Sequence, residues 1–315
     1  MATAMKIAGQ SVLPGEHKIV SLNIAKLPSN TSIDTEIHVF RSAKKGPVLL
    51  LMAGMHGDEV NGVDIVRRMI ADRLATPEAG TIIAIPILNV YGFLNYSRLV
   101  PDGKDVNRSF PGNKNGSLAS RVAFLFMQEI YPFFDYGIDF HTGGGNRYNY
   151  PQIRCLLDNK TNLRLATAFN APITLNAPLR DRSLRREASR KGKSIIVFEG
   201  GESLRLSEES TKFGIQGARR VMKELGMISE ADPPGKASTI VNKSSWIRAH
   251  KSGIFRSIVR PGQLIKKRQI IGNITDPFAS FEVNVKSNYD GIVIGLTYDA
   301  VVGQGDALLH LGLLE

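Results

Sequence analysis

"LLLMAGMHGDEVNG", residues Leu49–Gly62, joins an apolar run to a cluster of polar residues. The run ends at a glycine, and His56 and Glu59 follow within a few residues. An apolar run between glycines is typical of a buried strand, and the next residues carry apolar side chains at helical spacing. The pattern predicts a strand over residues 46–54 and a helix over residues 58–72. The turn between them places an imidazole and a carboxylate at the end of a strand.

The same alternation of apolar runs and amphipathic stretches continues to about residue 225. Further strands are predicted over residues 81–88, 135–141 and 193–201, and further helices over residues 117–131 and 207–226. Such an α/β chain forms a mostly parallel or mixed sheet with helices on both faces. Ligands of these sheets bind beyond the carboxyl ends of the strands. His56, His141 and Glu199 all fall at such ends.

The chain changes in character at "SEADPPGKAST", where prolines and a glycine predict a linker over residues 232–238. Beyond it, an all-β segment contains a loose internal repeat, Ser252–Ile274 against Asp290–Gly312. Two such halves can intertwine into a small barrel, a pattern that resembles the barrel-sandwich hybrid of biotinyl and lipoyl carriers. The joining segment "TDPFASFEVNV" has no lysine to carry such a group. We expect a catalytic domain over residues 1–231 and a small β domain over residues 239–315.

The composition is that of an ordinary globular protein. Of 315 residues, 43% are hydrophobic and 22% are charged, which argues against disorder. No apolar run reaches the roughly 18 residues of a membrane span, and the first residues lack the apolar core of a signal peptide. Cys155 is the only cysteine, so an intramolecular disulfide is impossible. We expect a cytoplasmic protein without a membrane partner. The oligomeric state stays open, a homo-oligomer included.

The net charge of +11 invites comparison with nucleic-acid-binding proteins. The basic residues are scattered, however, and no nucleic-acid-binding motif is present. The densest basic patch, Arg180–Lys193, is typical of a solvated helix face. We therefore expect no nucleic-acid partner, and a positive field that attracts small anionic substrates.

His56 and Glu59 stand three residues apart at the predicted start of a helix, so both can face one ion. Imidazole and carboxylate suit zinc, and catalytic zinc sites use three protein ligands and a water. Among six histidines, His141 is the best third ligand, because it follows an apolar strand and precedes a glycine-rich turn. Asp139 is placed to orient an imidazole. The sequence predicts one zinc ion per chain at these residues.

A polar segment, "NYSRLVPDGKDVNRSFPGN" (Asn95–Asn113), carries Arg98, Asn107 and Arg108. Its prolines and glycines predict a loop. An arginine fork binds a carboxylate with two parallel hydrogen bonds, and it can also stabilise a developing oxyanion. The segment is thus either a substrate-binding loop or a basic surface loop.

The motifs "GMHGDE", "DVNRSFPG", "DFHTGG" and "VFEGGE" closely resemble, in this order, the zinc-dependent succinylglutamate desuccinylase/aspartoacylase family. That family is related to zinc carboxypeptidases and pairs a carboxypeptidase-like α/β domain with a C-terminal β domain. The segment "SSWIRAHKSGIF" is similar to the bacterial deacylase branch with a barrel-type C-terminal domain. The resemblance implies zinc ligands His56, Glu59 and His141, the general base Glu199, the carbonyl-polarising Arg98, and the carboxylate-binding pair Asn107 and Arg108.

Three assignments stay open at this point. Glu202 is the alternative base, but Glu199 is preferred because it lies at the end of the predicted strand. The resemblance also implies a later substrate-binding arginine and a tyrosine from the C-terminal domain. The candidates are Arg180, Arg182 and Arg185 for the arginine, and Tyr289 and Tyr298 for the tyrosine.

The expected function is hydrolysis of the amide bond of a small anionic N-acyl amino acid, of the N-acetyl or N-succinyl type. Zinc lowers the pKa of its bound water to about 7, and Glu199 takes the proton and returns it to the leaving amine. A metallocarboxypeptidase that acts on peptides is the alternative, because it uses the same ligands and arginines. A pocket closed by the β domain favours acyl amino acids, and an open groove favours peptides.

Overall fold

The computed structural model describes residues 4–314 of the chain. The strands before the predicted linker are β1 (Met5–Ile7), β2 (Gln10–Val12), β3 (His17–Lys26), β4 (Ser32–Arg41), β5 (Val48–Met52), β6 (Thr81–Ile85), β7 (Tyr136–Gly143), β8 (Arg147–Cys155), β9 (Ile173–Asn176) and β10 (Ser194–Glu202). The helices are α1 (Val60–Ala71), α2 (Val90–Leu94), the 3-10 helix η1 (Val106–Arg108), α3 (Leu118–Glu129), α4 (Lys160–Phe169), α5 (Leu184–Arg190) and α6 (Glu208–Glu224). The remaining strands are β11 (Thr239–Val241), β12 (Ser244–Arg248), β13 (Gly253–Ser257), β14 (Leu264–Ile265), β15 (Ile270–Thr275), β16 (Glu282–Lys286), β17 (Gly291–Thr297), β18 (Val301–Val302) and β19 (Ala307–Leu313).

One mixed sheet dominates the molecule, with strand order β12-β19-β17-β8-β10-β7-β5-β6-β4-β3. Its centre is parallel, because β10 pairs with β7, β7 with β5 and β5 with β6 in parallel orientation. β8 and β4 flank this centre in antiparallel orientation, and β3 forms a hairpin with β4. The α/β fold is as predicted, and the antiparallel flanks make the sheet mixed.

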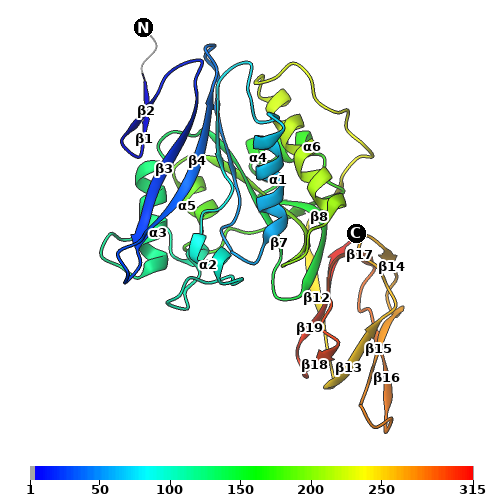
Figure 1. Ribbon diagram of the computed structural model, residues 1–315. Helices are drawn as coiled ribbons and strands as arrows, with labels where there is room; N and C mark the ends of the chain where they lie inside the picture. Colours follow the sequence, from blue (N-terminus) through cyan, green and yellow to red (C-terminus); the bar gives the residue numbers. More distant parts are fainter. Residues whose placement is uncertain (1–3, 315) are drawn as a thin grey trace.

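Helices cover both faces of this sheet (Figure 1). On one face, α3 and α5 pack against side chains such as Leu50 and Met52 of β5. On the other face, α1, α4 and α6 pack against Leu49 and Leu51. Alternate residues of β5 thus enter different cores, which explains why its sequence is apolar throughout. Both faces of the strand are removed from water.

Serine side chains fix the starts of two predicted helices. Ser117 accepts a hydrogen bond from the Ser120 amide at the start of α3, and Ser207 accepts one from the Ser210 amide at the start of α6. Within residues 4–314, no helix is both long and apolar enough to cross a membrane.

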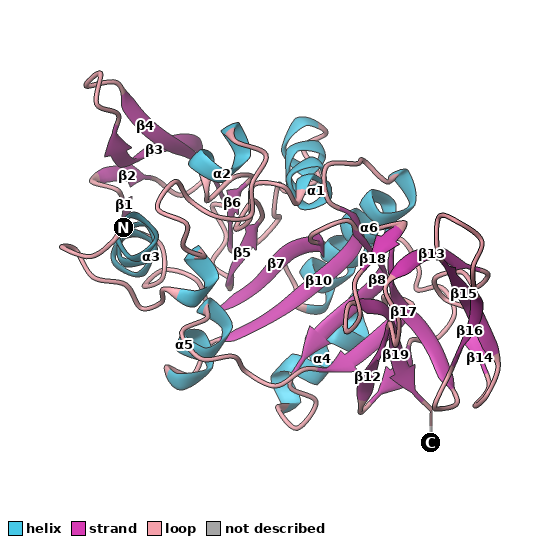
Figure 2. Ribbon diagram, turned by 90° about the horizontal axis from the view of Figure 1, so that it is seen from below, coloured by secondary structure: helices cyan, strands magenta, loops and turns pink. Residues whose placement is uncertain are grey.

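The main sheet continues into the C-terminal segment. β17 pairs with β8, and β11 pairs with β9, so strands on either side of residues 232–238 are hydrogen-bonded to each other. Figure 2 shows the long strands β8 and β10 beside β12, β17 and β19. Residues 232–238 themselves contain no helix or strand. The division of the chain at this segment stays a prediction.

The two halves of the C-terminal repeat exchange strands. β14 of the first half pairs with β17 of the second, and β18 of the second half pairs with β13 of the first. A separate core that includes Phe255, Ile271 and Leu309 lies between the sheets. These pairings are those expected of intertwined halves. The likeness to biotinyl and lipoyl carriers stays a prediction.

Candidate active site

Three buried side chains meet beyond the carboxyl ends of β5 and β7. His56 and Glu59 come from the turn before α1, and His141 comes from β7. Their candidate ligand atoms all lie within 4.8 Å of one another. The Nδ1 atoms of His56 and His141 each lie 2.7 Å from one oxygen of the Glu59 carboxylate. The three predicted metal ligands are therefore brought together.

Each histidine has a second carboxylate at its other ring nitrogen. Asp105 Oδ1 lies 3.3 Å from His56 Nε2, and Asp139 Oδ2 lies 2.9 Å from His141 Nε2. Carboxylates in this position fix the ring and the tautomer of a metal-binding histidine. Asp139 reaches the ring because β7 continues beyond it. Two oriented imidazoles and one carboxylate form a donor set that fits zinc.

The electrostatics of this cluster favour a bound cation. Burial lowers the pKa of His141, but the Asp139 and Glu59 carboxylates outweigh burial and raise that pKa well above its usual value. Burial also lowers the pKa of His56, but the Glu59 and Asp105 carboxylates outweigh burial and raise that pKa above its usual value. The pKa of Glu59 is held well below its usual value, because the two histidines outweigh its burial. The cluster attracts protons, and a metal cation would satisfy the same carboxylates.

Arg98 lies directly beside the cluster. Its guanidinium donates to Glu59 Oε1 at 3.2 Å and to Asp105 Oδ2 at 2.9 Å. The Asp105 carboxylate also accepts a hydrogen bond from the backbone N–H of Asn107 at 2.7 Å. Burial raises the pKa of Asp105, but His56 and Arg98 outweigh it and keep this carboxyl ionised. The Asp105 carboxylate thus links both Arg98 and the backbone of Asn107 to His56, a predicted metal ligand.

Glu199 lies opposite His141 in the parallel pairing of β10 with β7. Its Oε2 accepts a hydrogen bond from Asn149 Nδ2 at 2.7 Å, and its Oε1 lies 3.2 Å from Arg154 Nη1. Glu199 lines the same cavity as His56, Glu59 and His141, whereas Glu202 is not among the described residues that line it. The geometry favours Glu199 over Glu202 as a group that can reach a substrate.

The cavity has a volume of about 600 Å³ and a predominantly basic wall. Its arginines are Arg98, Arg108, Arg147, Arg154, Arg180 and Arg185. Its carboxylates are those of Glu59, Asp139 and Glu199. The excess of cationic groups favours an anionic ligand.

Both residues predicted to bind a carboxylate line this cavity. Asn107 Oδ1 accepts a hydrogen bond from the Leu184 amide at 3.1 Å, which ties the loop to α5. Arg108 Nη1 donates to the Asn107 carbonyl at 2.5 Å. These contacts fix the backbone and the guanidinium of the loop before any ligand binds.

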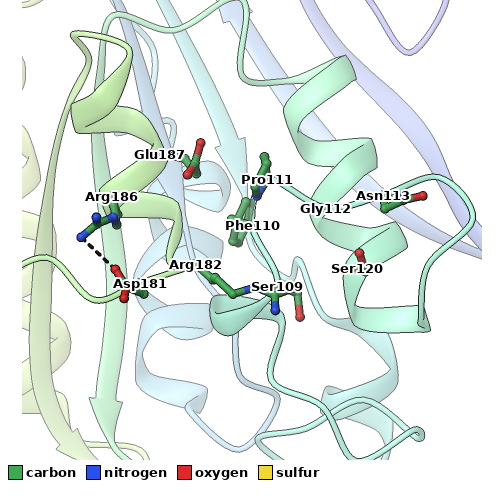
Figure 3. A pocket seen from close by; sticks show the side chains of 10 residues that line it. All are labelled: Ser109, Phe110, Pro111, Gly112, Asn113, Ser120, Asp181, Arg182, Arg186 and Glu187. Atoms are coloured by element: carbon green, nitrogen blue, oxygen red, sulfur yellow. Dashed lines mark ion pairs between the residues drawn. The ribbon is translucent and has the colours of Figure 1, made fainter.

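The three candidates for a further arginine differ in position. Arg185 lines the cavity, but its guanidinium donates to three backbone carbonyls, and burial lowers its pKa to about 10. Arg180 lines the cavity and is exposed to solvent. Arg182 instead lines a second cavity of about 550 Å³, together with Phe110 and Arg186 (Figure 3). Its place in the cavity lining and its exposure favour Arg180.

The β domain contributes three residues that the sequence predictions missed. Ser244 and Trp246 of β12 and His310 of β19 line the cavity. Two of them lie in "SSWIRAHKSGIF", so the resemblance offered a signal, but His310 stands in no motif. Strand pairing alone brings it there.

The two tyrosine candidates do not line this cavity. Tyr289 and Tyr298 line two other hollows of the β domain. No tyrosine is among the described residues that line the cavity of the predicted metal ligands, and Trp246 is the only aromatic side chain besides the histidines in that described lining.

Comparisons with known proteins agree with the motifs. Residues 45–225 match the model of the succinylglutamate desuccinylase/aspartoacylase catalytic domain. The N-alpha-acetyl-L-2,4-diaminobutyric acid deacetylase of Halomonas elongata is 26% identical over 278 residues, which cover 84% of this chain and 81% of the relative.

Solved structures share the fold over nearly the whole chain. A succinylglutamate desuccinylase/aspartoacylase from Rhodobacter sphaeroides has a TM-score of 0.83 and 24% identity, with 94% of each chain covered. The product-bound ectoine utilization protein EutE from Ruegeria pomeroyi has a TM-score of 0.84 and 21% identity, with 96% of this chain and 98% of that one covered. Since the family model matches more than half of the chain, the protein belongs to the succinylglutamate desuccinylase/aspartoacylase family.

Proposed function

We propose that the protein is a zinc-dependent hydrolase that cleaves the amide bond of a small N-acyl amino acid and releases the amino acid. The observation that carries this proposal is the buried His56–Glu59–His141 cluster in one arginine-lined cavity with Glu199. The relative from Halomonas elongata, whose name describes a deacetylase of an acetylated amino acid, supports the reaction class.

His56, Glu59 and His141 would hold the zinc ion, which when bound supplies a Lewis acid and acidifies water. Glu199 is the general base, which takes a proton from the attacking water and later returns it to the leaving amine. Arg98, whose guanidinium donates a hydrogen bond to Asp105, would stabilise negative charge that develops on the amide oxygen.

Asn107 and Arg108 are proposed to hold the α-carboxylate of the amino acid. A planar guanidinium binds a carboxylate in one orientation, which fixes the scissile bond beside the water. The carboxamide of a good substrate should therefore not be turned over. Arg108→Lys should lower kcat/KM despite the unchanged charge, because an ammonium group cannot present the same fork.

The β domain is proposed to wall the cavity and to carry no cofactor. Ser244, Trp246 and His310 close one side of the cavity, which suits a small substrate better than a peptide. The carrier-like halves lack a lysine in the joining segment, residues 275–285. In this proposal the domain forms part of the cavity wall and does not act as a carrier.

The decisive experiment is a panel of N-acetyl, N-succinyl and N-formyl amino acids, assayed for released amine. Chelation should abolish turnover and added zinc should restore it. About one zinc ion per chain is expected by metal analysis, with loss of zinc in His56→Ala and no loss in the exposed control His250→Ala. No turnover of any member of the panel would refute the proposed reaction. Equal zinc in wild type and His56→Ala would refute the ligand assignment.

A further inference from the structure

Two histidines lie side by side on the hairpin of β3 and β4, and the reaction described above uses neither of them. In the antiparallel register Ile19 pairs with His38 and His17 pairs with Phe40, so His17 and His38 are diagonal neighbours. His17 Nε2 lies 3.3 Å from His38 Nδ1. The hairpin forms one end of the strand order, on the opposite side of the sheet from β12 (Figure 1). Neither histidine is among the described residues that line the candidate active site, so the pair is separate from it.

The distance between the two nitrogens suits two ligands of one metal ion. Imidazole nitrogens bind zinc at about 2.0–2.1 Å, so two of them lie about 2.9–3.4 Å apart at right-angled or tetrahedral coordination. The observed 3.3 Å falls within this range. If each ring carries its proton on the other nitrogen, His17 Nδ1 and His38 Nε2, both facing lone pairs are free for an ion. A turn of the rings about their side-chain bonds then directs both lone pairs at that ion.

The surroundings hold the two rings close together but leave them accessible. The Phe40 ring stacks on His17, with 3.9 Å between ring centres and 8° between ring planes. Phe40 is 4% exposed, so this contact anchors His17 to the core. His17 itself is exposed, and His38 is partly buried. Within residues 4–314, the only hydrogen bond of either ring is the one between them. An ion from solvent can therefore reach both nitrogens without breaking another hydrogen bond of this part of the chain.

The surroundings of the pair also keep both rings in the form that binds metals. Burial, and then the Arg73 guanidinium, lower the pKa of His17. Burial and His17 lower the pKa of His38, and they outweigh the Glu36 carboxylate, which raises it. Both imidazoles are therefore neutral near pH 7, which is the form that a metal ion requires. Glu36 is exposed two residues before His38 on the same face of β4, so it adds negative charge near the pair.

We propose that His17 and His38 form a separate metal site, which binds Cu²⁺, Ni²⁺ or Zn²⁺ on the surface of the β3–β4 hairpin. Imidazole suits these three ions, whereas Mg²⁺ and Ca²⁺ prefer oxygen ligands, and Cu²⁺ binds nitrogen sites most tightly of the series. Water completes the coordination. Two protein ligands hold an ion less tightly than the three of the candidate active site, so gel filtration removes it and leaves the one zinc ion expected above. The site does not depend on the proposed hydrolase activity.

Electron paramagnetic resonance of Cu²⁺ tests this site, because bound imidazole nitrogens split the copper signal. The full-length protein is titrated with Cu²⁺ against a competing chelator, and the same titration is made with His17→Ala and His38→Ala. We expect wild type to bind one more Cu²⁺ than either variant, with couplings to two nitrogens in the difference spectrum. Each substitution should weaken binding of that ion by at least about 10-fold, since even changes around a metal ligand cost about 10- to 100-fold in affinity.

His250→Ala is the matched control, because His250 is an exposed histidine whose ring makes no hydrogen bond or ring contact within residues 4–314. This variant should bind Cu²⁺ as wild type does. Thermal denaturation without added metal shows whether each variant is folded. Equal copper stoichiometry and affinity in wild type and in folded His17→Ala and His38→Ala would overturn the inference, and so would a difference spectrum with a single nitrogen. Because copper binding is measured without turnover, failure of the hydrolase proposal would leave this result standing.

Discussion

At the residue scale, carboxylates of the same cavity have different surroundings and hence different uses. Glu59 lies between two imidazoles and is almost fully buried. Glu199 instead lies between an amide and a guanidinium and faces the cavity. Environments that differ in this way assign different roles to chemically identical groups. The proposed metal ligand and the proposed general base can therefore share one cavity.

Glu199→Gln tests the proposed base. The amide is isosteric and can still accept a hydrogen bond, so the fold and the metal content should be unchanged. The rate should fall by about 10²- to 10⁴-fold, the usual share of general acid–base catalysis. Single-turnover kinetics of Glu199→Gln and of the neighbouring control Glu202→Gln provide the measurement. A crippled Glu202→Gln beside an active Glu199→Gln would show that the base has been assigned to the wrong carboxylate.

His310 also predicts a pH dependence of stability. Its pKa is about 3 in the folded protein against 6.5 for the free side chain, so the unfolded chain binds the proton more readily. Its contribution to stability is complete above pH 6.5 and is lost as the pH falls toward 3. The free energy of unfolding of wild type, relative to His310→Phe, should therefore shrink by about 1 kcal/mol per pH unit between about pH 6 and 4. Urea denaturation at several pH values measures this difference, and a constant difference would contradict the buried neutral imidazole.

At the element scale, the start of α1 lacks a stabilising side-chain cap, because its N-cap residue is a predicted metal ligand. Its N-cap residue, Glu59, makes no side-chain capping hydrogen bond, because the carboxylate faces the two histidines. A missing cap costs about 1 kcal/mol. The turn before α1 also packs tightly on α2, since a Cβ atom at Gly57 would lie 1.8 Å from the carbonyl carbon of Gly92.

Gly57→Ala should therefore force the turn or α2 to move. We expect a loss of about 1–3 kcal/mol in the free energy of unfolding, as for other overpacked sites. Zinc content should fall as well, because the displaced turn carries His56 and Glu59. Thermal denaturation and metal analysis test both effects. Gly235→Ala, in open space, is the matched control and should resemble wild type; a Gly57→Ala protein of normal stability would refute the tight contact.

At the scale of the whole molecule, charge and topology act together on the cavity. The chain carries a net charge of +11, and six arginines line the cavity. The continuous sheet brings the β domain against this cavity. A small ligand that enters the cavity therefore meets the positive field of the arginines. Such a field increases the rate at which anions associate, and salt screens it.

The salt dependence of kcat/KM measures this field. For a dianionic N-acyl amino acid, kcat/KM should fall by about 3- to 10-fold as ionic strength rises from about 0.02 to 0.5 M. A singly charged substrate of the same length should show a smaller effect. Equal salt dependence for the two substrates would mean that the arginines act only at short range.

Local sequence was sufficient for the parts that depend on neighbouring residues. Apolar runs and capping serines predicted the central strands β5, β6, β7 and β10 and the helices α1, α3 and α6, because burial and helix capping depend on residues close in the chain. The closeness of His56 and Glu59, the proposed ligand pair, was predictable for the same reason. The match of the family model agrees with the four motifs.

Contacts between distant segments were not predictable in this way. Asp105 meets His56 across 49 residues, and Asn149 meets Glu199 across 50. His310 reaches the cavity through the pairings of β19 with β17 and of β17 with β8, which no local pattern encodes. Strand order and register depend on the packing of the whole sheet, so this wall of the cavity is a property of the folded chain rather than of any motif within it.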